Sequence, residues 1–152
     1  MKNVKLILTM IAFPVLMFAG LSSAQEQKML PIDVHGELRV EGNQIVGESG
    51  EPAQLMGMSL YWSIWGGERF YNRDVVTWLV EDWNIDLIRA SMGVEEGAQG
   101  YIHDKEEQTK MVDSVITAAV DNGIYVIVDW HTHEIHLEEA KEVFNKWMQS
   151  CS

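Results

Sequence analysis

The sequence predicts an α/β fold in which parallel strands alternate with helices, and two observations carry this prediction. Residues 123–131 form a short apolar run without polar alternation, which is typical of a strand buried on both faces of a parallel sheet. Segments with strand-like and helix-like patterns alternate along the chain up to this run. The run ends in Asp129, Trp130 and His131, and active sites of such folds lie at the carboxyl ends of strands. This end of the strand is therefore the expected functional edge.

A short β-hairpin is expected before the alternating units. Residues 37–40 and 44–46 are strand-like, and residues 41–43 between them give a turn signal. Residues 55–61 then form the first expected central strand. The hairpin thus precedes the main sheet.

The first helix is expected to begin at Asn72 or Asp74. Asn84 suits the left-handed conformation that ends many helices. The second strand is expected over residues 85–92 and carries Arg89 within an otherwise apolar pattern. The apolar residues at helical spacing are Val75, Val76, Leu79, Val80 and Trp83.

The second helix is expected to start at a capping box made by Asp104 and Glu107. Asn122 and Gly123 end it, and the third strand, residues 124–130, follows at once. The order hairpin, β, α, β, α, β, α implies parallel strands with right-handed crossovers. The apolar stripes of the second and third helices are Val112, Val115, Ile116, Ala119 and Val120, and Leu137, Ala140, Phe144, Trp147 and Met148.

Residues 1–24 predict a secretory signal peptide. Lys2 and Lys5 give a positive start, residues 6–20 are apolar, and residues 21–24 offer a small-residue cleavage site. The apolar stretch is short for a spanning helix, so an uncleaved membrane anchor is the less favoured alternative. We therefore expect a secreted protein, periplasmic or extracellular, that does not associate with a membrane after cleavage.

The remaining chain divides into a linker, one domain and a short tail. Residues 25–34 are expected to be a linker, residues 35–149 the domain, and residues 150–152 a tail. Cys151 is the only cysteine, so an intramolecular disulfide and a cysteine-based metal site are both excluded.

The composition excludes some classes of partner. The formal net charge of −12 argues against nucleic acid, whose phosphates need Lys and Arg, and against anionic membrane surfaces. It is compatible with a neutral substrate. No Gly-x-Gly-x-x-Gly motif follows a strand, so nucleotide binding has no support, and no cofactor is predicted.

Arg89 is the first candidate functional residue. A guanidinium in an apolar strand is costly unless it is paired or lies at the wet end of the strand. Two interpretations stay open, a structural ion pair and a substrate contact.

The histidines after the third strand form the densest local group. His131, His133 and His136 lie within six residues, together with Glu134. One interpretation is a metal site, because His-x-His at a strand end suits zinc-like ions. Another is a substrate-binding imidazole at His131 with the rest as loop, and a third is surface histidines. The position of His131 directly at the strand end favours a functional role for it.

Aromatic residues follow the first strand. Tyr61, Trp62 and Trp65 lie in an expected loop, where exposed indoles are uncommon. Flat apolar rings stack on the C–H faces of sugars, so we expect either Trp62 or Trp65 to pack and the other to face a ligand. The remaining indoles on helix stripes are expected in the core: Trp78, Trp83 and Trp147.

Taken together, these segments resemble the N-terminal half of a bacterial endoglucanase (cellulase) of glycoside hydrolase family 5. The resemblance covers residues 34–149, and the order and spacing of its pieces make it specific. The matching stretches are residues 34–40, 55–59, 71–76, 78–83, 87–92 and 123–131.

The resemblance implies a (β/α)8 TIM barrel, here truncated to the hairpin and about three βα units. It implies that Arg89 and His131 contact substrate and that Trp65 stacks on a sugar ring. Tyr61 stands where many relatives carry His, and is taken as a fourth substrate-binding residue. Gly93 stands where many carry Tyr. The implied substrate is a β-1,4-linked polysaccharide, cellulose or a related glucan.

The family's retaining mechanism uses two Glu carboxyls roughly 5–5.5 Å apart. The resemblance places one in an Asn-Glu-Pro motif after the fourth strand and the other after the seventh. The sequence has no Asn-Glu dipeptide, and a full barrel needs about 250 residues. We therefore expect both catalytic residues beyond the chain end, and an inactive fragment whose open strand edges promote aggregation.

Two other functions stay open. One is a non-catalytic carbohydrate-binding remnant that uses Trp65, Arg89 and His131. The other is a metal-dependent barrel hydrolase that uses His131 and His133.

Overall fold

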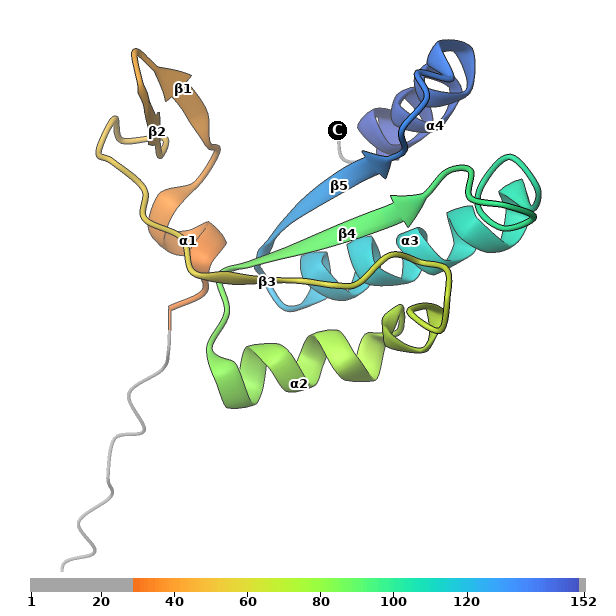
Figure 1. Ribbon diagram of the computed structural model, residues 1–152. Helices are drawn as coiled ribbons and strands as arrows, with labels where there is room; N and C mark the ends of the chain where they lie inside the picture. The colour runs from red at the N-terminus through yellow and green to blue at the C-terminus, as the bar shows by residue number, and fades with distance from the viewer. Residues whose placement is uncertain (1–28, 151–152) are drawn as a thin grey trace, which may run out of the picture.

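The computed structural model describes residues 29–150 and consists of a hairpin beside a three-stranded sheet that is covered by helices (Figure 1). The expected signal peptide and Cys151 lie outside the described residues. No helix within residues 29–150 is both long and apolar enough to cross a membrane.

The elements follow the predicted alternation. Strands β3, β4 and β5 are neighbours in that order and run parallel, whereas β1 and β2 form the antiparallel hairpin. In chain order, the helices and strands are α1 (Pro31–His35), β1 (Arg39–Glu41), β2 (Gln44–Val46), β3 (Gly57–Ser59), a 3-10 helix η1 (Glu68–Phe70), α2 (Arg73–Trp83), β4 (Leu87–Gly93), α3 (Lys105–Asp121), β5 (Tyr125–His131) and α4 (Leu137–Ser150).

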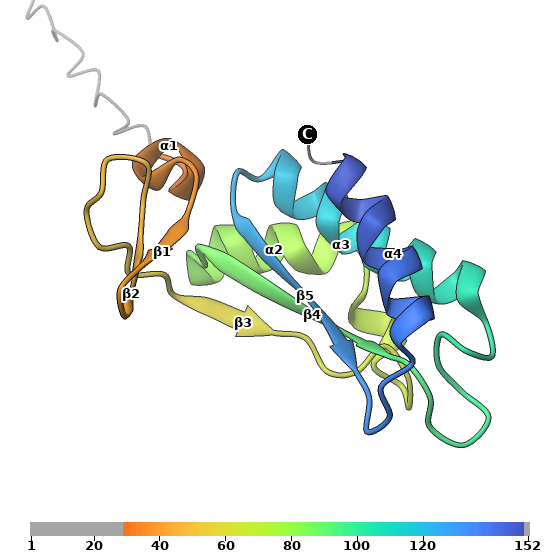
Figure 2. The same cartoon turned by 90° about the horizontal axis from the view of Figure 1, so that it is seen from above.

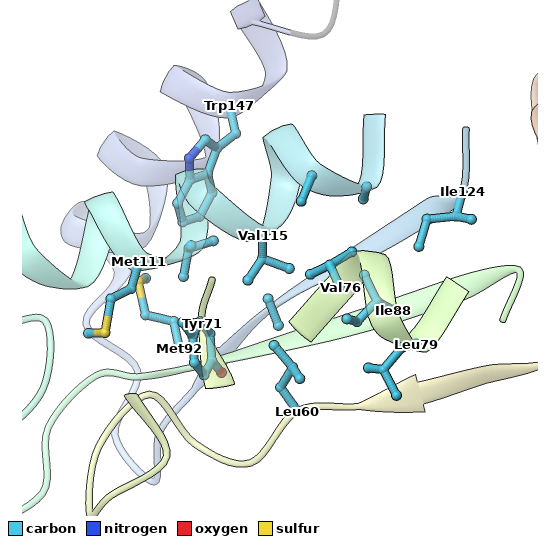
Figure 3. Packing of buried hydrophobic residues seen from close by; sticks show 14 of the residues in the cluster. Leu60, Tyr71, Val76, Leu79, Ile88, Met92, Met111, Val115, Ile124 and Trp147 are labelled. Carbon is cyan, nitrogen blue, oxygen red and sulfur yellow. The ribbon is translucent and has the colours of Figure 1, made fainter. Parts of the chain in front are cut away.

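The three long helices cover one face of the sheet (Figures 1 and 2). Ile88 and Met92 of β4 point toward the helices and pack with Val76 of α2 and Val115 of α3 (Figure 3). Trp147 of α4 joins the same core, as its helical spacing predicts. The βα loops gather at the carboxyl ends of the strands, opposite the hairpin (Figure 2).

The helix ends confirm the local signals. The Asn72 side chain accepts a hydrogen bond from the Val75 amide at 3.0 Å, and Asp104 accepts one from the Glu107 amide at 3.1 Å. These caps satisfy amides that the first turn of a helix leaves unpaired. Asn84 ends α2 in the left-handed conformation with φ 52°. Short-range sequence chemistry therefore sets where these helices begin and end.

The expectation of a linker over residues 25–34 is wrong for its final residues. Pro31–His35 form α1, in which proline occupies the first turn, where its fixed φ favours a helix. The Ile32 amide donates to the Gly123 carbonyl at 3.2 Å, and the Tyr125 hydroxyl donates to the Gly36 carbonyl at 2.6 Å. These bonds dock α1 at the amino end of β5, so the segment is part of the fold.

The first central strand is shorter than expected. Residues 55–61 were predicted extended, but β3 covers only Gly57–Ser59. Beyond it, the Leu60 amide still donates to the Arg89 carbonyl at 2.9 Å, and the Ser63 amide to the Ser91 carbonyl at 3.0 Å. The chain thus stays beside β4 after β3 ends, but without a regular ladder.

The third strand is not buried on both faces. β5 matches the predicted position, yet the Ile127 side chain is 47% exposed. Val126 and Val128 pack against the helix core, and alternation places Ile127 on the other face, which the described residues leave largely uncovered. One face of this apolar strand therefore has no covering layer within residues 29–150.

Two indoles expected in the core are exposed instead. Trp78 is 49% and Trp83 57% exposed, and their rings meet edge-on with centroids 6.2 Å apart. Within the described residues no element covers this part of α2, so the rings pack on each other rather than on the sheet. Three further residues predicted on apolar stripes are also exposed: Val120, Leu137 and Met148.

Candidate functional site

The candidate site lies on the face of the sheet that points away from the helices. Ile88 and Met92 face the core, so alternation along β4 places Arg89 on the opposite face. Alternation along β5 does the same for Asp129 and His131, because Val128 packs against the core. Asp129 and His131 lie toward the carboxyl end of β5, where the functional edge was predicted. Arg89 is the third of the seven residues of β4, and its long side chain extends to Asp129.

One carboxylate oxygen joins the three residues. Arg89 Nη2 donates to Asp129 Oδ2 at 2.5 Å, and His131 Nδ1 lies 2.7 Å from the same oxygen. Arg89 Nη1 also donates to Ser59 Oγ at 2.8 Å, which links β3 to β4. We refer to Arg89, Asp129 and His131 as the Asp129 cluster. It is partly buried rather than sealed, so a ligand can reach it.

The partners fix the tautomer of His131. A carboxylate only accepts hydrogen bonds, so Nδ1 carries the proton that Asp129 receives. Arg89 Nη2 lies 3.3 Å from Nδ1, but both are donors when Nδ1 is protonated, so this contact is not a hydrogen bond. In the neutral ring Nε2 is then left as an acceptor.

The two interpretations of Arg89 are not alternatives. The guanidinium forms an ion pair with Asp129, which offsets its cost in an apolar strand. It also lies in the open part of the site, with two of its five N–H groups bonded to Ser59 and Asp129. Arg89 is therefore both paired and available to a ligand.

A row of aromatic rings extends from the Asp129 cluster. The Trp62 ring meets His131 edge-on at 4.0 Å between centroids and stacks on Trp65 at 5.1 Å with planes 15° apart. Trp62 is partly buried, whereas Trp65 is 51% exposed, so Trp62 packs and Trp65 faces outward. The Trp65 amide donates to Gln99 Oε1 at 3.2 Å, and its φ is 56°. This left-handed conformation turns the loop where the exposed ring is presented.

The loop that carries these rings is tied to β4. The Tyr71 hydroxyl lies 2.8 Å from the carbonyl of Tyr61 and 2.7 Å from that of Ser91, and both can accept its proton. Burial raises the pKa of Tyr71, which keeps the hydroxyl protonated as a donor. Ser63 Oγ accepts from the Gly93 amide at 2.9 Å and bonds to Gln108. These buried bonds hold the backbone of the loop.

Tyr61 is held by its backbone carbonyl, which accepts from the Tyr71 hydroxyl, rather than by its side chain. Its ring is about half exposed, and among the described residues it has no hydrogen bond or ring contact with the Asp129 cluster. A side chain at Gly93, where the resemblance leads us to expect Tyr, would meet Ile64 Cδ1 at 2.9 Å. Ile64 therefore fills the space beside Gly93.

The other histidines pair with acids across two loops. His136 Nε2 lies 2.7 Å from Glu95 Oε2, and His133 Nε2 lies 3.4 Å from Glu96 Oε1. These contacts connect the loop after β4 to the loop after β5. Within residues 29–150 no group of three or more His, Cys, Asp or Glu side chains is arranged to hold a metal ion.

Sequence reasoning missed two members of the site and left a third undecided. Asp129 was noticed at the end of the strand but not assigned a role, although its spacing of two from His131 places both on one face of a strand. Ser59 gave no signal, because its contact with Arg89 depends on how two distant strands pair. Trp62 was left undecided between packing and ligand binding.

The arrangement defines consecutive βα units of a (β/α)8 barrel with a polar and aromatic site at the carboxyl ends of its strands. The model of the family "Cellulase (glycosyl hydrolase family 5)" matches residues 46–152. The chain therefore belongs to glycosyl hydrolase family 5.

Individual relatives agree with this family. Endoglucanase Z of Dickeya dadantii is 43% identical over 109 residues, which is 70% of this chain and 25% of that protein. A solved structure from Cytophaga hutchinsonii is 41% identical with a TM-score of 0.72, covering 78% of this chain and 39% of that one. The catalytic domain of Thermobifida fusca endoglucanase Cel5A (E5), solved in complex with cellotetraose, is 33% identical with a TM-score of 0.73, covering 80% and 41%.

The chain spans about a quarter of the length of endoglucanase Z and about two-fifths of each solved chain. The likeness is thus to one part of these proteins.

Proposed function

We propose that this chain supplies the sugar-binding side of a secreted family 5 endoglucanase that acts on a β-1,4-linked glucan. The observation that carries the proposal is the Asp129 cluster beside the stacked Trp62–Trp65 pair, at the carboxyl ends of parallel strands. Arg89, His131, Trp65 and Tyr61 are the proposed substrate contacts.

The chemistry of these groups suits an uncharged sugar chain. The remaining Arg89 N–H groups donate to hydroxyl oxygens, and His131 Nε2 accepts from a hydroxyl. The exposed Trp65 ring offers a flat apolar surface to the C–H face of a pyranose. Relatives named endoglucanase, one of them in complex with cellotetraose, support a glucan ligand.

Hydrolysis needs groups that we do not find in this chain. A retaining glycosidase uses two carboxyl groups about 5–5.5 Å apart. The sequence has no Asn-Glu dipeptide, which the resemblance makes the mark of the acid/base residue. We therefore propose that these 152 residues bind glucan without cleaving it at enzymatic rates.

The export of the protein rests on residues 1–24. Their positive start, apolar middle and small-residue end support cleavage by a signal peptidase and a periplasmic or extracellular location. Mass spectrometry of the exported chain tests this, because cleavage is expected to leave Gln25 at the amino terminus.

Binding of cellotetraose by the purified chain tests the function. Tryptophan fluorescence titration should show saturation, and Trp65→Ala should weaken binding about tenfold because it removes the stacking face. Trp78→Ala is the matched control, since Trp78 is 49% exposed, like Trp65 at 51%, but lies on α2. Equal losses in both variants would contradict the site.

A reducing-sugar assay on a soluble cellulose derivative tests the lack of turnover. We expect no release above the background set by the Trp65→Ala variant. Turnover comparable to that of an intact endoglucanase would overturn the binding-only part of the proposal, and would leave the sugar contacts in place.

A further inference from the structure

We propose that Asp129 is a positioning residue that holds Arg89 and His131 for the ligand through a single carboxylate oxygen. Its role is distinct from the sugar contacts proposed above, because it acts through its two neighbours. The sugar-binding part of the inference rests on the proposed function.

The geometry concentrates both contacts on Oδ2. Arg89 Nη2 lies 2.5 Å and His131 Nδ1 2.7 Å from this oxygen, although Arg89 comes from β4 and His131 from β5. The strand register places Asp129 opposite Ser91, two residues beyond Arg89 on the same face of β4. A shift of either strand would separate the pairs, so the parallel register assembles the cluster.

The contact between His131 Nδ1 and Asp129 decides whether His131 Nε2 is a hydrogen-bond donor or acceptor. With the proton on Nδ1, Nε2 presents a lone pair, so the ring accepts from a sugar hydroxyl and cannot donate to one. Without Asp129 the proton is free to move to Nε2, which would turn the ligand-facing atom into a donor. Asp129 therefore sets the polarity of the His131 contact.

The contact with Asp129 also sets the orientation of the Arg89 guanidinium group. Asp129 on one side and Ser59 on the other each take one N–H group, which fixes the plane of the guanidinium. Removing Asp129 would also leave this partly buried cation without its counter-ion. One substitution should therefore disturb two ligand contacts.

Nitrogen-15 NMR of the histidine side chains tests the inference on the full chain at mildly alkaline pH, where imidazole is neutral. In the unsubstituted protein we expect His131 as the Nδ1–H tautomer, and in Asp129→Ala the Nε2–H tautomer. Asp129→Asn should keep the Nδ1–H form, because its amide oxygen can take the place of Oδ2. Asp121→Ala is the matched control, since it removes a carboxylate paired with Arg73 on the helices and should leave His131 unchanged.

An Nε2–H tautomer in the unsubstituted protein would overturn the inference, as would an unchanged His131 in folded Asp129→Ala. If Asp129→Ala does not fold, the spectrum of the unsubstituted chain still decides. A second readout is cellotetraose affinity, expected to fall about tenfold in Asp129→Ala and less in Asp129→Asn. If the chain binds no cellotetraose but the tautomers behave as expected, the proposed function fails while the positioning role stands.

Discussion

The Trp62 indole meets the His131 imidazole edge-on, with ring centroids 4.0 Å apart. The Trp62 ring also stacks on the Trp65 ring, with centroids 5.1 Å apart. Trp62 therefore connects the hydrogen-bonded part of the site to its exposed aromatic surface. Its ring contacts His131 on one side and Trp65 on the other.

Replacing Trp62 with Ala should disturb both neighbours at once. We expect an affinity for cellotetraose at least as low as that of Trp65→Ala, and a loss of stability of about 1 kcal/mol from the two ring contacts. Trp62→Phe should retain part of both. Calorimetric titration and thermal unfolding measure the two effects, and an unchanged affinity in Trp62→Ala would contradict the supporting role.

Replacing Arg89 with Lys should weaken glucan binding about tenfold although the charge is kept. An ammonium group cannot reproduce the planar fork that bonds to both Ser59 and Asp129. Arg73→Lys serves as the control, because Arg73 pairs with Asp121 on the exposed helices. Similar affinities in Arg89→Lys and the unsubstituted chain would show that the fork is not used.

Replacing Tyr71 with Phe should lower the free energy of unfolding by about 1 to 1.5 kcal/mol, because the carbonyls of Tyr61 and Ser91 lose a donor. Denaturant unfolding at neutral pH measures this. Tyr61→Phe is a suitable control, since its ring is about half exposed and its hydroxyl makes no hydrogen bond among the described residues.

The same tyrosine predicts a pH dependence. Burial raises the pKa of Tyr71 above its ordinary value of 10.0, so the folded state favours the neutral phenol. The resulting stability is fully present below about pH 10 and is lost as the pH rises through the raised folded-state pKa. We expect a smaller alkaline loss of stability in Tyr71→Phe. Burial also raises the pKa of Tyr101 and Tyr125, so some loss should remain.

Replacing Gly67 with Ala should displace the aromatic loop. The added Cβ would lie 1.8 Å from the Trp62 carbonyl oxygen, so the backbone must move. We expect a loss of about 1 to 3 kcal/mol and a changed tryptophan fluorescence spectrum. Gly42→Ala, at the tip of the hairpin with nothing within 4 Å of the added carbon, should leave the spectrum unchanged. A Gly67→Ala protein with native fluorescence would contradict this account of the loop.

The free side of β5 predicts self-association of the chain. Within the described residues β5 pairs only with β4, and Ile127 is 47% exposed on the face away from the helices. Unpaired strand edges beside apolar surface favour edge-to-edge contacts. Sedimentation at micromolar concentration should show oligomers, and Ile127→Lys should reduce them. A monomer with cooperative thermal unfolding would contradict the prediction.

Local signals predicted most of the fold. The caps at Asn72 and Asp104 and the left-handed end at Asn84 are short-range effects, so the residues that cause them lie within one helical turn of the boundary. The expectation failed where packing decides. Trp78 and Trp83 fit an apolar stripe, but burial depends on which neighbouring element covers the stripe. The docking of α1 on Gly123 likewise joins residues far apart in sequence.

The sequence by itself determined the order of the elements, because this follows from the periodicity of strands and helices. The resemblance of its motifs to family 5 endoglucanases indicated the family, and the positions of Arg89 and His131 in their strands made them candidates. Only the tertiary structure decided which residues the candidates contact. Arg89 and Asp129 are 40 residues apart, and Arg89 and Ser59 are 30 apart. Their contacts depend on the register of three parallel strands, which is a property of the assembled sheet and leaves no mark within any one segment.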